Sequence, residues 1–135
     1  MMQDKIADLL TRIRNATMVK KSTVEIPYFK FGYELCVLLK DQGYLTDVAA
    51  AGEGVKKVIH VNLKYDKRSH KPVIGKISRV SRPGLRRFEG VQDIPRVQGG
   101  LGIMVVSTSL GKLLTDHQAR QHGVGGELVC SVETG

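Results

Sequence analysis

Hydrophobic residues recur at helical spacing near the start of the chain. They occupy positions i, i+3, i+4 and i+7 of one stripe: Ile6, Leu9, Leu10 and Ile13. This spacing places them on one face of an amphipathic helix, which we expect from about Asp4 to Met18. Four polar residues fall largely off that stripe: Thr11, Arg12, Arg14 and Asn15.

The rest of the first half alternates strand and helix signals. Thr23 to Pro27 predicts a short strand closed by proline, and Tyr44 to Ala50 with Val55 to Tyr65 predicts a hairpin about Gly52-Glu53-Gly54. Apolar residues at helical spacing predict a second helix that stops at Gly43: Phe31, Leu35, Leu38 and Leu39. In the hairpin's second strand the residues expected to face inward are Ile59, Val61, Leu63 and Tyr65. The expected order of this half is α-β-α-β-β.

The second half has mostly strand signals. A strand is predicted from Val73 to Arg82, and the last strand from Glu127 to Glu133, with Leu128, Cys130 and Val132 alternating against Val129 and Ser131. Pro83-Gly84 marks a turn, and a long connection is bracketed by Pro95 and Gly99-Gly100. Thr115 and Gln118 form a capping box for a short helix that ends at Gly123.

These elements predict the α+β class. We expect two small α+β domains packed together, residues 1–66 with the order α-β-α-β-β and residues 67–135 mostly β with one short helix. The boundary is placed where the composition turns polar and basic, from Asp66 to Lys71.

One buried strand ends in hydroxyl residues. The apolar run after Gly99-Gly100 predicts the strand, and Ser107, Thr108 and Ser109 follow it, with Gly111 free to take positive φ. Three small hydroxyls suit close approach to a sugar edge, a base edge or a phosphate. By itself the pattern is only weakly diagnostic, and a Ser/Thr turn that caps the next helix fits it better.

Positive charge is concentrated in the second half. Of the formal net charge of +8, residues 67–135 carry +6, with 11 Lys/Arg and 5 Asp/Glu. From Lys67 to Arg87 there are eight cations and no acidic residue, which favours an anionic partner over a merely solvated face. Nucleic acid is the first candidate partner and an acidic membrane surface the second.

The sequence argues against several other classes of protein. No apolar run approaches the ~20 residues of a membrane span, and the start of the chain has no secretory signal, so we expect the protein to stay in the compartment where it is made. Cys36 and Cys130 are expected to be buried thiols. The glycines of Gly99 to Gly102 precede a strand, whereas a dinucleotide loop follows one, and neither Ser107 nor the histidines have catalytic or metal-ligand spacing. We therefore expect no enzyme, no cofactor and no metal.

Several motifs together resemble one family. In order, they are Asp-Lys-Ile-Ala-Asp-Leu-Leu-Thr-Arg-Ile-Arg-Asn-Ala (4–16), Ser-Arg-Pro-Gly-Leu-Arg (81–86), Gly-Leu-Gly-Ile (100–103), Ser-Thr-Ser-Leu-Gly (107–111), Thr-Asp-His-Gln-Ala-Arg (115–120) and Gly-Gly-Glu-Leu-Val-Cys (125–130). Their order and spacing resemble bacterial small-subunit ribosomal protein eight from Asp4 to Val132. The resemblance implies a two-domain α+β protein that binds the central domain of small-subunit ribosomal RNA early in assembly. It also implies neighbouring small-subunit proteins as partners, a place in a cytoplasmic or organellar ribosome and, in some members, repression of their own messenger RNA.

The resemblance also implies RNA-binding residues. In the second half these are Ser107, Thr108, Ser109, Gly111, Gly125, Gly126 and Glu127. In the first half they are Thr11, Asn15, Lys30 and Lys56. The basic stretch adds Arg86 and Arg87 as phosphate contacts, with Phe88 as a stacking face. Glu127 is expected to orient the Ser-Thr-Ser hydroxyls or backbone by accepting hydrogen bonds, the alternative being an exposed carboxylate at a strand end.

The chain departs from the family pattern at several of these positions. Phe29 stands where the family commonly has serine in Pro-x-Ser-Lys, Phe88 where it usually has tyrosine, and Leu110 where it often has lysine. The chain also ends without the family's closing aromatic strand. These changes bear on the strength of RNA binding.

The composition favours a structured RNA as the target. RNA helices expose 2′-hydroxyls in a shallow minor groove, which small hydroxyl side chains can contact. Only 5% of the residues are aromatic, too few for the stacking platforms of a single-strand binder. The function expected is a structural RNA-binding protein of the small ribosomal subunit, and the alternative is a free-standing RNA-binding regulator that acts away from ribosomes.

Overall fold

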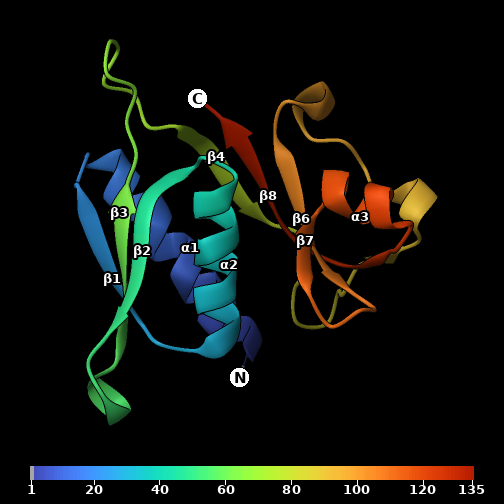
Figure 1. Cartoon of the computed structure of the whole chain (residues 1–135), viewed down its shortest axis with the longest axis horizontal. Helices are drawn as coiled ribbons and strands as arrows, with labels where there is room; N and C mark the ends of the chain where they lie inside the picture. Colours follow the sequence, from blue (N-terminus) through green and yellow to red (C-terminus); the bar gives the residue numbers. More distant parts are fainter. Residues whose placement is uncertain (1) are drawn as a thin grey trace. The chain divides into compact units, whose positions relative to one another are not determined.

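The chain folds into two compact units, each built on an antiparallel sheet (Figure 1). The computed structural model describes the backbone of residues 2–135 and the side chains from Lys5 onward. The first unit contains residues 2–74 and Gly135, and the second is Gly75–Thr134. The polar segment from Asp66 to Lys71 is a tight turn, in which the Asp66 carboxylate accepts the backbone N–H groups of Arg68 and Ser69 at 3.1 and 2.8 Å.

The first unit has the predicted order α-β-α-β-β. Its elements are α1 (Met2–Met18), β1 (Thr23–Pro27), α2 (Lys30–Asp41), β2 (Leu45–Ala51) and β3 (Val58–Leu63). The strands are ordered β1-β3-β2, and both helices pack on one face of this sheet (Figure 1). The side chains of the core come from all five elements and include Leu9, Ile13, Ile26, Leu35, Leu39, Leu45, Ile59 and Val61. The inward alternation predicted for the hairpin is confirmed for Ile59, Val61 and Leu63, whereas Tyr65 is only half-buried.

Phe29 turns into this core directly before α2 begins. It is the N-cap residue, makes no side-chain cap hydrogen bond and is only 9% exposed. A Cβ on Gly32, one turn later, would lie 2.5 Å from the Phe29 ring and 2.9 Å from Leu9 Cδ1. Phe29 stands where the family pattern has serine. Its ring fills the space that Gly32 leaves open because glycine has no side chain.

This contact makes the cost of a substitution at Gly32 depend on Phe29. Gly32→Ala is expected to lower the free energy of unfolding by about 1–3 kcal/mol, because overpacking outweighs the better helix propensity of alanine. In a Phe29→Ser background the ring is absent, and the same substitution should cost much less or stabilise. Urea unfolding of the four proteins checks this, and an equal cost of Gly32→Ala in both backgrounds would contradict it.

The second unit is a five-stranded sheet with one short helix. Its elements are β4 (Ile74–Arg79), β5 (Phe88–Glu89), β6 (Ile103–Thr108), β7 (Leu113–Thr115), α3 (Asp116–His122) and β8 (Gly126–Thr134). The strand order is β4-β8-β6-β7, and β5 pairs with β8. The mostly β unit with one helix is confirmed, while β5 and β7 are additions that the sequence pattern did not indicate.

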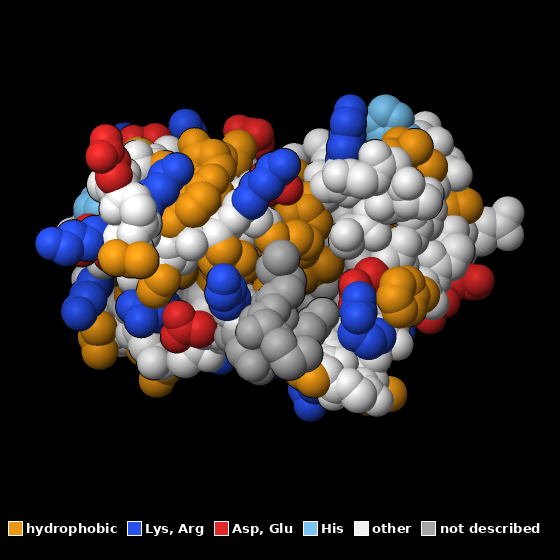
Figure 2. Space-filling model, turned by 90° about the horizontal axis from the view of Figure 1, so that it is seen from below, with side chains coloured by type: hydrophobic (Ala, Val, Ile, Leu, Met, Phe, Trp, Pro, Cys, Tyr) orange, Lys and Arg blue, Asp and Glu red, His pale blue; other side chains and the backbone are white. Residues whose placement is uncertain are grey.

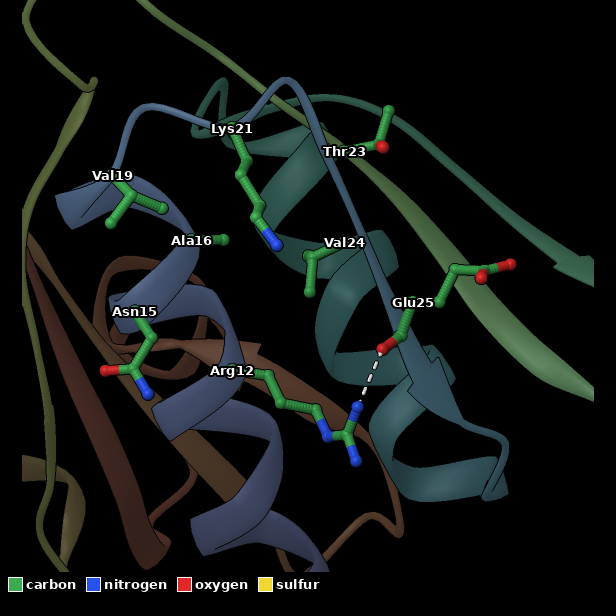
Figure 3. A pocket seen from close by; sticks show the side chains of 8 residues that line it. All are labelled: Arg12, Asn15, Ala16, Val19, Lys21, Thr23, Val24 and Glu25. Carbon is green, nitrogen blue, oxygen red and sulfur yellow. Dashed lines mark hydrogen bonds between the residues drawn. The ribbon is translucent and has the colours of Figure 1, made fainter.

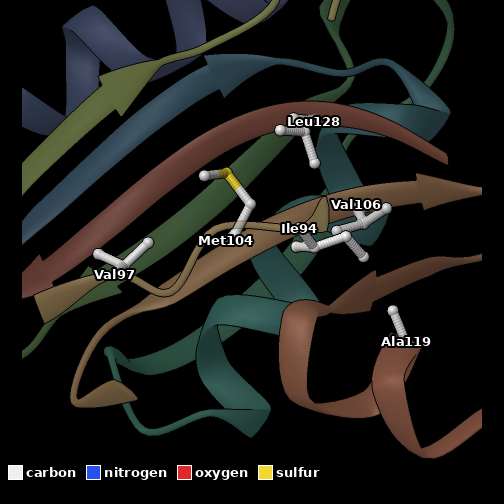
Figure 4. Packing of buried hydrophobic residues seen from close by; sticks show 6 residues of the cluster. All are labelled: Ile94, Val97, Met104, Val106, Ala119 and Leu128. Carbon is white, nitrogen blue, oxygen red and sulfur yellow. The ribbon is translucent and has the colours of Figure 1, made fainter. Parts of the chain in front are cut away.

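A β-bulge in β8 corrects the alternation predicted for that strand. Val105 pairs with Cys130 and Val106 with Leu128, so Val129 is the extra residue. The bulge places Leu128 and Cys130 on opposite faces of the sheet, and Val129 is buried as well. Leu128 therefore joins a cluster on the α3 side of the sheet (Figure 4), whose members are Ile94, Val97, Met104, Val106, Ala119 and Leu128.

The ends of α3 match the sequence prediction. The Thr115 hydroxyl accepts the N–H of Gln118 at 3.1 Å, and the Gln118 side chain accepts the N–H of Thr115 at 3.0 Å, so the capping box is confirmed. Gly123 closes the helix with φ of +67°.

Both cysteines are buried thiols that form no disulfide, as predicted. Burial raises the pKa of the Cys36 thiol to about 12, so it stays protonated at neutral pH. No helix in the described part of the chain has the length and apolar character required to cross a membrane.

Candidate nucleic-acid interface

The predicted hydroxyl loop is the tight turn between β6 and β7. Ser107 and Thr108 still belong to β6, and the turn itself runs over Ser109, Leu110 and Gly111. Thr108 is only 7% exposed, and its hydroxyl donates to the carbonyl of Lys112 at 2.8 Å. All three hydroxyls of Ser107, Thr108 and Ser109 are predicted to face a ligand, but the Thr108 hydroxyl instead closes the turn.

Ser109 and its neighbours form the accessible tip of this turn. Ser109, Leu110 and Gly111 are all exposed, and Gly111 has φ of +78°. The N–H of Gly111 donates to the Thr108 carbonyl at 3.1 Å, which fixes the backbone of the tip. A small polar tip is thus held by a strand whose residues 103–106 are buried.

Ser107 lies in a row of side chains that crosses four strands. The register pairs Phe88 with Glu127, Glu127 with Ser107, and Ser107 with Leu113. Directly opposed residues of an antiparallel sheet point to the same face, with Cβ atoms about 5 Å apart. The structure therefore brings together three of the predicted site residues, Phe88, Glu127 and Ser107, and Phe88 is 63% exposed.

Gly125 and Gly126 allow backbones to approach closely beside this row. A Cβ on Gly126 would lie 2.1 Å from the Ser107 carbonyl oxygen, and one on Gly125 would lie 2.3 Å from that of Glu89. Any larger residue would push β8 away from β5 and β6. These glycines therefore have a packing role, whatever contact they make with a ligand.

The Glu127 carboxylate is bound by Arg86 and does not orient the hydroxyl loop as predicted. Arg86 Nε and Nη2 donate to its two oxygens at 2.5 and 2.7 Å. Within the described residues, neither Ser107 nor Ser109 donates a side-chain hydrogen bond to Glu127, whose carboxylate is instead held by Arg86 and by the Ser81 hydroxyl. The alternative, an exposed carboxylate, is also wrong, because the Glu127 side chain is only 12% exposed.

This ion pair changes the titration of both groups. The Arg86 hydrogen bonds hold the pKa of Glu127 below its ordinary value, against the desolvation that raises it. Hydrogen bonding to Glu127 likewise raises the pKa of Arg86. The pair's contribution to stability is therefore fully present above the ordinary pKa of a glutamate and is lost as the pH falls through the lowered one.

A rigid hairpin presents Arg86 to Glu127. Arg82 and Leu85 exchange backbone hydrogen bonds at 3.1 and 3.0 Å around Pro83-Gly84, where Gly84 has φ of +81°. The buried Ser81 hydroxyl accepts the N–H of Arg87 at 3.0 Å. Arg86 also lies over the Phe88 ring, with its guanidinium carbon 5.5 Å from the ring centroid. The motif Ser-Arg-Pro-Gly-Leu-Arg is thus the device that places Arg86.

Asp116 and Arg120 of α3 hold β6 in place through hydrogen bonds, a role that was not predicted from the sequence. Asp116 is fully buried and accepts the N–H of Met104 at 3.1 Å and Arg120 Nη1 at 2.7 Å. Arg120 Nη2 also donates to the Ile94 carbonyl at 3.1 Å. The available signal was an aspartate and an arginine four residues apart directly after a capping threonine.

The predicted RNA-binding residues of the first unit are all accessible. Thr11 and Asn15 lie on the exposed face of α1, Lys30 begins α2, and Lys56 lies in the β2–β3 connection. Asn15 lines a groove of about 490 Å³ between α1 and β1 (Figure 3). The other lining residues are Arg12, Ala16, Val19, Lys21, Thr23, Val24 and Glu25.

Arg12 crosses this groove and connects its two walls. Its Nε donates to Asp8 at 2.9 Å, and its Nη1 donates to the Glu25 carbonyl at 3.2 Å (Figure 3). Much of its hydrogen-bonding capacity is therefore used within the protein. Arg12 thus ties α1 to β1, and Asn15 is a second exposed polar residue of the helix that lines the groove.

Comparison with known proteins supports the family resemblance. The model of the family described as Ribosomal protein S8 matches residues 4–132. The chain is 51% identical over 131 residues to "Small ribosomal subunit protein uS8" of Laribacter hongkongensis (strain HLHK9), covering 97% of this chain and 98% of the relative. It is 52% identical over 131 residues to the protein of that name from Shewanella amazonensis (strain ATCC BAA-1098 / SB2B), with the same coverage. It is 46% identical over 129 residues to that of Gloeothece citriformis (strain PCC 7424), covering 96% of each. From its first helix to its last strand, this chain belongs to the ribosomal protein S8 family, whose members are structural ribosomal proteins and not enzymes.

Proposed function

We propose that this protein binds the central domain of small-subunit ribosomal RNA directly and supports assembly of the subunit. The observation that carries the proposal is the row of Phe88, Glu127 and Ser107 beside the exposed Ser109 turn. The Ser107 hydroxyl and the Phe88 ring lie on one side of the sheet and can contact 2′-hydroxyls and an unstacked base, and the half-exposed Arg87 guanidinium can contact phosphate. In this proposal the RNA-binding residues of the first unit, Thr11, Asn15, Lys30 and Lys56, add a second contact.

Footprinting of the purified protein on small-subunit ribosomal RNA tests this function. We expect protection confined to one structured region of the central domain. Uniform protection along the RNA would indicate that the protein binds through charge alone, without a specific site. If the protein also protected a similar site on its own messenger RNA, the proposal would extend to autorepression. Competition between the two RNAs for the protein would be the readout.

Sedimentation separates the ribosomal role from that of a free-standing RNA-binding regulator. A subunit protein is expected to co-migrate with small subunits on a sucrose gradient after a moderate salt wash. Recovery at the top of the gradient would favour the regulator. The basic segment shared by both roles cannot distinguish them.

The ion pair predicts an asymmetric effect of the two arginines on salt dependence. Arg87 is only loosely placed against Glu89, at 3.9 Å, so Arg87→Gln should flatten the plot of log affinity against log salt by about one unit. Arg86→Gln should change the slope much less, since Glu127 already balances its charge. Glu127→Gln should make the slope steeper, because it releases the charge of Arg86.

Binding titrations at four or more salt concentrations give these slopes for all three variants. Lys64→Gln, an exposed lysine outside the candidate interface, is the control for loss of one positive charge. Equal flattening by Arg86→Gln and Arg87→Gln would mean that Arg86 leaves Glu127 to contact phosphate.

A further inference from the structure

An aromatic and cationic cluster lies at one end of the first unit, where β1 ends and α2 and β3 begin. The N–H of Tyr28 donates to the Lys57 carbonyl at 3.0 Å, which ties the two segments together. The Lys57 ammonium lies 4.0 Å from the centroid of the Tyr28 ring, and the Tyr33 ring centroid is 6.0 Å from that of Tyr28. The position of the Tyr28 ring is therefore fixed by contacts from two elements.

The Tyr28 hydroxyl is available to a ligand. Among the described residues it makes no hydrogen bond, and it is not one of the enclosed polar atoms without a partner. The hydroxyl is therefore not fully enclosed, although the ring is half-buried. Next to it, Phe29 has turned into the core, so the hydroxyl that a serine would carry at that position is missing.

The charge around Tyr28 suits an anionic partner. Lys30 lies two residues after Tyr28, and Lys56 directly precedes Lys57. Both Lys30 and Lys56 are exposed, so three lysines from two segments lie at this end. The nearest acidic residues in sequence are Glu53, which within the described residues forms no ion pair with Lys56 or Lys57, and Glu25, whose carboxylate lies 3.8 Å from His60 Nδ1. Figure 2, which views the molecule from this end, shows lysine and arginine side chains set among apolar ones on the first unit, with isolated acidic groups.

We propose that the Tyr28 hydroxyl and the Lys57 ammonium form one contact to the ribose–phosphate backbone of RNA. The phenol can donate to a phosphate oxygen or pair with a 2′-hydroxyl, and the ammonium keeps donors for phosphate while it lies over the ring. Position 29 has phenylalanine where the family pattern has serine, and in this contact the hydroxyl of Tyr28, one residue earlier, takes the place of the serine hydroxyl. This proposal rests on the proposed function, because it assumes that the first unit lies against RNA.

Binding of small-subunit ribosomal RNA by Tyr28→Phe and Lys57→Gln tests the contact. Tyr28→Phe keeps the ring and its cation–π contact, so only the hydroxyl is lost, and affinity should fall roughly threefold to tenfold without a change in salt slope. Lys57→Gln should weaken binding and flatten the slope by about one unit. Tyr65→Phe is the matched control, because the Tyr65 hydroxyl donates within the protein, to the Lys21 carbonyl at 2.5 Å.

The outcomes separate this contact from the function on which it rests. Wild-type affinity of folded Tyr28→Phe, with wild-type protein binding the RNA specifically, would overturn the contact alone. Normal RNA binding by both variants combined with poor incorporation into subunits would also overturn it and indicate a protein partner at this surface. If the wild-type protein bound ribosomal RNA no better than unrelated RNA, the proposed function itself would fail.

Discussion

Asp116→Ala is expected to lower the free energy of unfolding by about 3–5 kcal/mol, the cost of removing one partner from a buried ion pair. The carboxylate is fully buried, and its loss leaves the N–H of Met104 and part of the Arg120 guanidinium without an acceptor. Because Met104 lies in β6, we also expect reduced protection of that strand in hydrogen exchange. Urea unfolding measures the stability.

The chain offers a closely matched control for this prediction. Asp8 and Arg12 form the same aspartate–arginine pair at i and i+4, but their side chains are 50% and 45% exposed. Asp8→Ala should therefore cost only about 0.2–0.5 kcal/mol. Similar costs for the two substitutions would show that burial does not strengthen the Asp116 pair.

Much of the fold could be predicted because its signals are local. The stripe of Leu9 and Ile13, the Pro27 that closes β1 and the capping box at Thr115 each depend on neighbours within one or two turns. The strands β5 and β7 were not predicted, because segments of two and three residues are too short to show an alternation of apolar and polar side chains. The bulge at Val129 could not be predicted either, because it depends on the register between β6 and β8.

The turn that carries the predicted hydroxyls could be expected from the sequence, whereas the pairings of the side chains around it could not. The hydroxyl turn and Glu127 were marked by composition and by the family motifs. The partner of Glu127, however, is Arg86, 41 residues away in sequence, and the choice between that guanidinium and a nearby serine depends on the three-dimensional path of the Pro83-Gly84 hairpin. The inward turn of Phe29 likewise depends on the space over Gly32, which only the packed helices define.

Ser107→Ala combined with Ser109→Ala is expected to weaken specific RNA binding by about tenfold to several hundredfold, since each lost hydrogen bond in a closely fitted contact costs roughly 1–3 kcal/mol. Ser107 lies in the row with Phe88 and Glu127, and Ser109 is at the exposed tip of the turn. Within the described residues neither hydroxyl makes a hydrogen bond with the protein, so the fold should remain intact. Quantitative filter or gel binding to the central domain of small-subunit ribosomal RNA, beside an unrelated structured RNA, measures the effect.

Thr108→Val separates the chemistry of this turn from its shape. It removes the hydroxyl that closes the turn on the Lys112 carbonyl while keeping a side chain of similar size. We expect it to weaken specific binding through a less ordered tip and to lower stability, whereas the double serine variant should lose affinity at unchanged stability. Ser22→Ala, at an exposed serine of the first unit, is the control for a lost hydroxyl elsewhere. Normal binding by the double serine variant would mean that the turn does not recognise the RNA, whatever the effect of Thr108→Val.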